Sequence, residues 1–75
     1  MEYYRNLGGD SGIAAYEIGQ DFIRVQFNDG AIYLYTYASA GPHNIEYMKQ
    51  LAAAGEGLNA FINTKVHKAY VRNAQ

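Results

Sequence analysis

The chain has 75 residues, which is enough for one small domain. Its formal net charge of −1 provides no overall field for nucleic acid or lipid, and the absence of cysteine excludes disulfides and thiolate metal sites. The sequence contains neither a basic leader with an apolar core nor an apolar run of about 20 residues. We therefore expect no signal peptide, no membrane association and a cytoplasmic location.

The N-terminal residues end in a cluster of turn formers, "GGDSG". Glycine adds backbone freedom, and Asp and Ser favour turns over strands. We predict a flexible N-terminal arm over residues 1–10 and a single domain over residues 11–75. Tyr3, Tyr4 and Leu7 leave open that this arm docks on the domain.

Three segments with strand-like patterns follow the arm. Apolar and polar residues alternate in "DFIRVQFN", and the Asn-Asp-Gly sequence at 28–30 is a strong hairpin signal. The third segment, "AIYLYTY", contains the two central tyrosines, Tyr33 and Tyr35. The pattern predicts an antiparallel meander whose strands cover residues 13–18, 22–27 and 31–37.

The length of the hairpin turn decides which way the central tyrosines face, because a shift of one residue turns every side chain over. With a two-residue turn at 29–30, Phe27 pairs with Ile32 and the tyrosines lie on the face away from the helices. With a three-residue turn at 28–30, Phe27 pairs with Ala31 and the tyrosines lie under the helices. The alternation alone does not choose between an aromatic platform and a core.

The spacing of apolar residues changes after the third strand, from the period of a strand to that of a helix. Pro42 suits the first turn of a helix, and Gly55 suits its end. A shorter helix is predicted in "GLNAFINTKV". The expected fold is α+β, a three-stranded antiparallel meander packed on one face by two C-terminal helices, in the order β-β-β-α-α. The apolar stripes of the two helices are Ile45, Met48, Leu51 and Ala52, and Leu58, Phe61, Ile62 and Val66.

Short motifs over residues 11–70 resemble the KTSC domain, a family named for its occurrence at the C-terminus of some lysyl-tRNA synthetases. Two departures stand out: "ASAGP" replaces the family's usual Val-Pro after the tyrosines, and its Ser-x-Gly reads Gly-Glu-Gly at 55–57. The features that carry the resemblance are Ser11, Ile13, Val25, Phe27, Gly30, Tyr33, Tyr35, Gly57, Phe61, Ile62 and Tyr70.

The resemblance has two implications. The family often has a charged residue between its two tyrosines, which implies that the intervening position is exposed and favours the three-residue turn. An RNA-binding role has also been proposed for the family, which implies the same role for this chain.

Cations gather toward the C-terminus. Lys65, Lys68 and Arg72 recur at spacings that would align them on one face of a continuing helix, and such a stripe can neutralise phosphates. Exposed tyrosines can stack on unpaired bases. The candidate nucleic-acid-binding residues are therefore Lys65, Lys68, Arg72, Arg24, Tyr35 and Tyr37, the two tyrosines on the condition that their rings reach solvent.

The sequence offers little catalytic chemistry. The two histidines, His43 and His67, lack a third ligand at a usual spacing, and no phosphate-binding glycine loop is present. We therefore expect no enzymatic activity, no metal and no cofactor. The alternative to RNA binding is a protein partner or a second copy of the chain, docked on the exposed face of the sheet.

Overall fold

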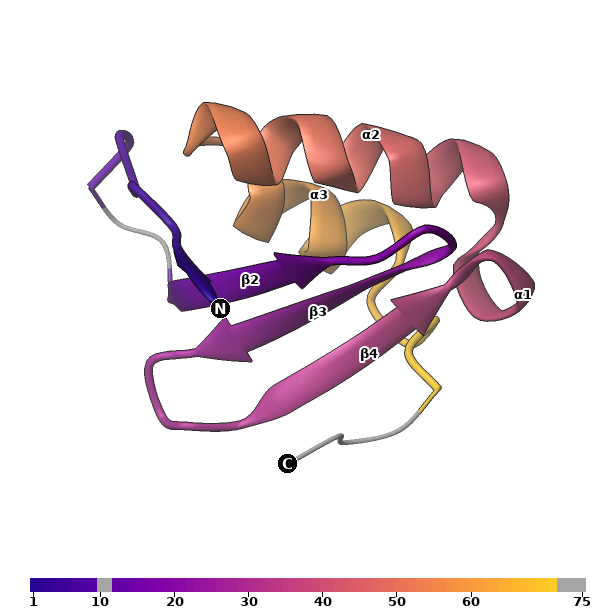
Figure 1. The fold of residues 1–75 in the computed structure, drawn as a ribbon. Coiled ribbons are helices and arrows are strands. Elements are labelled where there is room, and N and C mark those ends of the chain that lie inside the picture. The colour runs from indigo at the N-terminus through magenta and orange to yellow at the C-terminus, as the bar shows by residue number, and fades with distance from the viewer. Residues whose placement is uncertain (10–11, 72–75) are drawn as a thin grey trace.

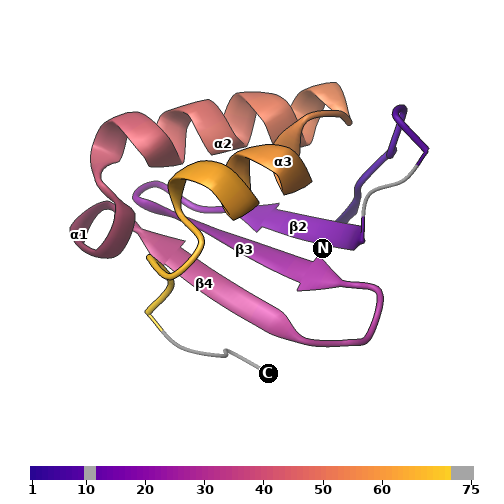
Figure 2. The same cartoon turned by 180° about the vertical axis from the view of Figure 1, so that it is seen from behind.

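In the described part of the chain, four antiparallel strands form one sheet in the order β1-β2-β3-β4, and two of the three helices cover one of its faces (Figures 1 and 2). This computed structural model describes residues 1–9 and 12–71. The predicted α+β class and the antiparallel meander are confirmed, with one more strand and one more helix than expected. The elements are β1 (Glu2–Tyr3), β2 (Ile13–Ile18), β3 (Phe22–Phe27), β4 (Ile32–Thr36), α1 (Tyr37–Ala40), α2 (Pro42–Ala54) and α3 (Leu58–Lys65).

The N-terminal segment, for which the sequence left a flexible arm and a docked arm open, pairs with β2 and contacts the end of α2 and the start of α3. Tyr4 is 6% exposed, and its hydroxyl accepts a hydrogen bond from the amide of Leu58 at 3.2 Å. The amide of Leu7 donates to the carbonyl of Gly55 at 2.7 Å. These contacts across the chain hold residues 2–7 against the domain.

The three-residue turn between β3 and β4 is confirmed. The amide of Phe27 donates to the Ala31 carbonyl at 2.9 Å, and Gly30 has a φ of 93°. Val25 consequently faces Tyr33, and Ile23 faces Tyr35. The central tyrosines therefore lie on the helix-covered face of the sheet.

A one-turn helix, α1, follows β4 and includes Tyr37, which the sequence placed in the strand. The Thr36 side chain accepts from the Ser39 amide at 3.0 Å, and the Ser39 hydroxyl accepts from the Thr36 amide at 2.9 Å. This reciprocal capping box stabilises the turn and redirects the chain into α2. Pro42 then starts α2, and Gly55, with a φ of 80°, ends it, as the sequence predicts.

The core lies between the sheet and the helices α2 and α3. The stripes predicted for the two helices contribute Ile45, Met48 and Ala52, and Leu58 and Ile62. Val66 follows α3 and is 2% exposed. The side chains that the sheet and N-terminal segment add to this core are Tyr4, Ile13, Ile23, Val25 and Tyr35.

Candidate functional site

A cavity of about 540 Å³ opens between the β3–β4 hairpin, the end of α3 and the segment that follows α3. Its volume lies in the range of about 300–1,000 Å³ that is usual for small-ligand sites. Three parts of the chain that are remote in sequence meet here, namely the segment at Gly12, the hairpin, and the end of α3 with the residues after it. The lining residues are Gly12, Phe27, Asn28, Asp29, Tyr33, Tyr35, Ile62, Asn63, His67, Lys68 and Tyr70.

Aromatic rings form one wall of the cavity. The ring centroids of Tyr33 and Tyr70 are 4.8 Å apart, and Phe27 meets Tyr33 edge to face at 5.6 Å. Tyr35 meets Tyr70 edge to face at 6.3 Å. These contacts fix the orientation of each ring, so the wall presents rigid π surfaces to the cavity.

Tyr35 is set deeper than the other rings and is 2% exposed. Burial raises its pKa to about 12, with smaller contributions from Tyr33 and Tyr70. The hydroxyl therefore stays protonated at neutral pH. Tyr35 lines the cavity, but its ring does not reach solvent. It therefore does not meet the condition under which it was a candidate for stacking on RNA bases.

Two side-chain amides also line the cavity. Asn28 comes from the hairpin turn and Asn63 from α3. In the part of the chain that the structure describes, neither amide group has a hydrogen-bond partner, so their donors and acceptors are open to a ligand. Asp29 accepts instead from the Ala31 amide at 3.0 Å and thereby stabilises the turn.

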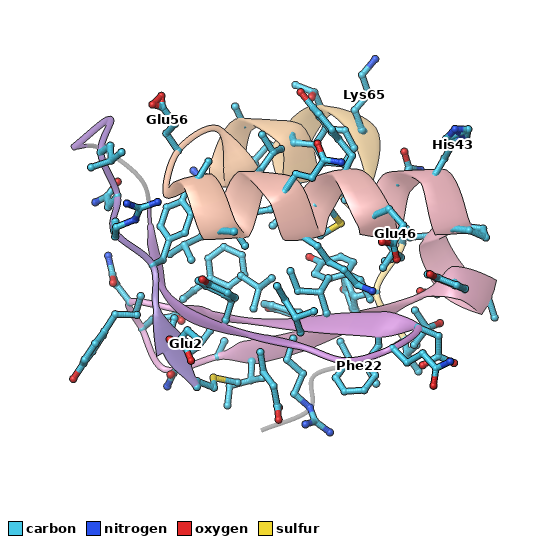
Figure 3. The ribbon with its side chains drawn as sticks, turned by 45° about the horizontal axis from the view of Figure 1, so that its top comes forward. Glu2, Phe22, His43, Glu46, Glu56 and Lys65 are labelled. Atoms are coloured by element: carbon cyan, nitrogen blue, oxygen red, sulfur yellow. The ribbon has the colours of Figure 1, made fainter. Side chains whose placement is uncertain are left out.

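The predicted cation stripe is interrupted. Helix α3 ends at Lys65, because the chain turns at the buried Val66 instead of continuing as a helix. Lys68 lines the cavity, whereas Lys65 points away from the sheet (Figure 3). Arg72 lies outside the described residues.

Lys65 and Lys68 share one property that the other described Lys and Arg side chains lack. Arg5 donates to the Ala53 carbonyl, Arg24 pairs with Glu17, and Lys49 pairs with Glu46. Within residues 1–9 and 12–71, Lys65 and Lys68 have neither an ion pair nor a hydrogen bond to their ammonium groups. Among the described Lys and Arg residues, the two whose charged groups have no partner therefore lie at the end of α3 and just after it.

The remaining candidates lie elsewhere. Arg24 is on the opposite face of the sheet by its register in β3, and its guanidinium lies 5.5 Å from the ring of Phe22. The Tyr37 hydroxyl donates to the Glu46 carboxylate at 2.5 Å, and Lys49 lies 5.7 Å from the Tyr37 ring. Neither Arg24 nor Tyr37 joins the cavity.

Sequence reasoning did not single out Asn63 or Tyr70 as site residues, although Tyr70 contributes to the resemblance. The spacing of Asn63 and His67 gives no usable signal, because α3 ends at Lys65, before His67. The cavity itself depends on contacts between remote segments, which no local pattern reveals.

Residues 1–9 and 12–71 place no three His, Cys, Asp or Glu side chains where they could hold a metal ion. No helix in these ranges has the length and apolar character needed to cross a membrane. Comparison with known proteins was also negative, because no family model, curated protein or solved structure matches this chain.

Proposed function

We propose that this chain is a non-catalytic, cytoplasmic RNA-binding module of the KTSC type, and that an unpaired base of single-stranded RNA occupies the cavity. The observation that carries this proposal is that one place combines an aromatic wall, two open amides and Lys68, which has no ion pair within the described residues. Proteins that recognise single-stranded RNA commonly stack bases on aromatic side chains and hydrogen-bond their edges.

Each part of the cavity has a role in this proposal. The base stacks against the rings of Tyr33 and Tyr70, and the amides of Asn28 and Asn63 hydrogen-bond its edge. Lys68 at the cavity contacts a neighbouring phosphate. With so few cations, the electrostatic contribution is small, and stacking supplies most of the affinity.

The test is a titration of fluorescently labelled single-stranded RNA at low salt, read by anisotropy. We expect Lys68→Gln to weaken binding several-fold and to reduce the slope of log K against log salt by about 0.7, the value for one phosphate on a single strand. Arg24→Gln is the matched control, because it removes one cation from the opposite face of the sheet. This control should leave the affinity unchanged.

Two results would overturn the proposal. One is an absence of binding at about 100 µM RNA, the weak end of non-specific nucleic-acid affinity. The other is an equal loss of affinity in Lys68→Gln and Arg24→Gln, which would indicate that RNA binds through the overall charge of the protein and not at the cavity. Chemical-shift mapping should place the largest changes at Tyr33, Asn63 and Tyr70.

A second candidate function is association with a protein partner or with a second copy through the uncovered face of the sheet. It is favoured by three partly exposed apolar side chains on that face, Phe22, Ile32 and Leu34. The Arg24–Glu17 ion pair interrupts this surface, which makes it less apolar than a typical dimer interface. Sedimentation at high concentration tests self-association, and a strict monomer would count against it.

A further inference from the structure

A second cavity, of about 300 Å³, lies between the N-terminal segment and the start of α3. Its lining residues are Tyr4, Asn6, Gly8, Glu56, Gly57, Asn59, Ala60 and Asn63. Asn63 also lines the first cavity. The two cavities therefore meet at this side chain.

Helix α3 lines both cavities. Asn59 and Asn63 are four residues apart, so they lie on the same side of the helix, separated by about 6 Å along its axis. Within the described ranges, the side-chain amide of Asn59, like that of Asn63, has no hydrogen-bond partner. The helix thus presents two successive open amides, one in the second cavity and one shared by both.

We propose that the second cavity holds the next nucleotide of the same RNA strand, so that the unit recognised is a dinucleotide. This inference rests on the proposed function. Amides pair with base edges and ribose hydroxyls, both of which an RNA strand offers. The step of about 6 Å exceeds the rise of about 3.4 Å between stacked nucleotides, so the two bases are held unstacked.

The charge of the second cavity indicates which part of the nucleotide enters it. Glu56 is exposed at its rim and points into solvent (Figure 3). A carboxylate here disfavours a phosphate. The occupant is therefore the uncharged base and ribose, while the phosphates stay on the side of Lys68.

The experiment compares a ribonucleoside monophosphate, a diribonucleotide and a trinucleotide by NMR titration. We expect the dinucleotide to bind about tenfold more tightly than the mononucleotide, as one additional stacked or hydrogen-bonded base provides. The gain in affinity from the dinucleotide to the trinucleotide should be smaller than tenfold. Asn59→Ala should abolish the gain of the dinucleotide and leave mononucleotide affinity unchanged.

Gln50→Ala is the matched control, because it removes an exposed amide from α2, away from both cavities. Alanine favours a helix, so both variants should fold, and their thermal midpoints check this. Equal affinities for mononucleotide and dinucleotide, or a gain that survives Asn59→Ala, would overturn the second subsite while leaving the proposed function standing. Absence of binding by every oligonucleotide would overturn both.

Discussion

The rings of Tyr33 and Tyr70 lie 4.8 Å apart between centroids, so a residue from the C-terminal segment closes one side of the cavity built on β4. A backbone hydrogen bond holds this arrangement, because the Val71 amide donates to the Leu34 carbonyl at 2.7 Å. Residues 69–71 consequently form a strap along the edge strand. The geometry of the cavity depends on the strap staying in place.

Removing the hydrogen bond of the strap should release Tyr70. Val71→Pro eliminates the donating N–H, and we expect ring-current shifts at Tyr33 to decrease and RNA affinity to fall. The loss of stability should be about 1 kcal/mol, the usual contribution of one hydrogen bond. Val71→Ala retains the N–H and is the control. Identical Tyr33 spectra in the two variants would contradict the role assigned to this bond.

The Tyr4 hydroxyl should be important for stability. It accepts the hydrogen bond of the Leu58 amide at the start of α3, in a buried position. Tyr4→Phe leaves that amide without its partner, which should lower the free energy of unfolding by about 1–3 kcal/mol. Urea denaturation monitored by circular dichroism measures this change.

Tyr3→Phe provides the matched control, since the side chain next to Tyr4 is 87% exposed. We expect a change within about 0.5 kcal/mol for this variant. Equal stability of Tyr3→Phe and Tyr4→Phe would show that the N-terminal segment is not docked in solution, as the flexible-arm prediction has it.

Stability should decrease in alkali, partly because of Tyr35. Its pKa is raised to about 12 in the folded protein from 10.0, so the folded state retains a proton that the unfolded state loses. The contribution is therefore fully present below pH 10 and is lost as the pH rises toward 12. Tyr35→Phe should flatten this loss, as measured by urea denaturation across that window.

A second tyrosine contributes in the same direction. The hydrogen bond to Glu46 raises the pKa of Tyr37, so wild-type stability alone does not isolate Tyr35. The comparison of Tyr35→Phe with wild type removes this contribution, which is common to both. Parallel stability curves for the two proteins between pH 10 and 12 would contradict the assignment of the raised pKa to Tyr35.

The sequence predicted those features that short-range chemistry determines. The hairpin turn is one, because the Asp29 side chain and the positive φ of Gly30 stabilise it within three residues. The resemblance to the KTSC domain favoured the three-residue turn over the two-residue turn. That choice places Tyr33 and Tyr35 on the helix-covered face of the sheet. The ends of α2 are equally local, since Pro42 and Gly55 mark them.

Features that depend on remote contacts escaped prediction. Strand β1 has two residues, too few for a period, and Tyr4 gains its burial and its hydrogen bond from a helix that begins at Leu58. The cation stripe is a different case, because it needed a helix that continues beyond the predicted segment, whereas α3 ends at Lys65 and Val66 is buried. The cavity combines three such segments, so its tyrosines could be anticipated but its position could not.

The contact between the N-terminal segment and the end of α2 yields a last prediction. Gly55 has a φ of +80°, and a Cβ there would lie 2.8 Å from the Cβ of Arg5. Gly55→Ala should therefore combine the cost of a left-handed alanine, about 1–2 kcal/mol, with a steric cost of about 1–3 kcal/mol. Hydrogen exchange at the Leu7 amide, which donates to the Gly55 carbonyl, should accelerate in this variant.

Gly9→Ala separates the two costs, because Gly9 has a φ of +83° but a Cβ added there would meet nothing within 4 Å. The free energy of unfolding of Gly9→Ala should decrease only by the cost of a left-handed alanine. The hydrogen-exchange rate at the Leu7 amide should stay unchanged. Chemical denaturation of both variants gives the difference, which we expect to exceed about 1 kcal/mol. If the two variants lose the same stability, Arg5 does not pack against Gly55, and the wall that residues 4–8 provide for the second cavity is not formed in solution.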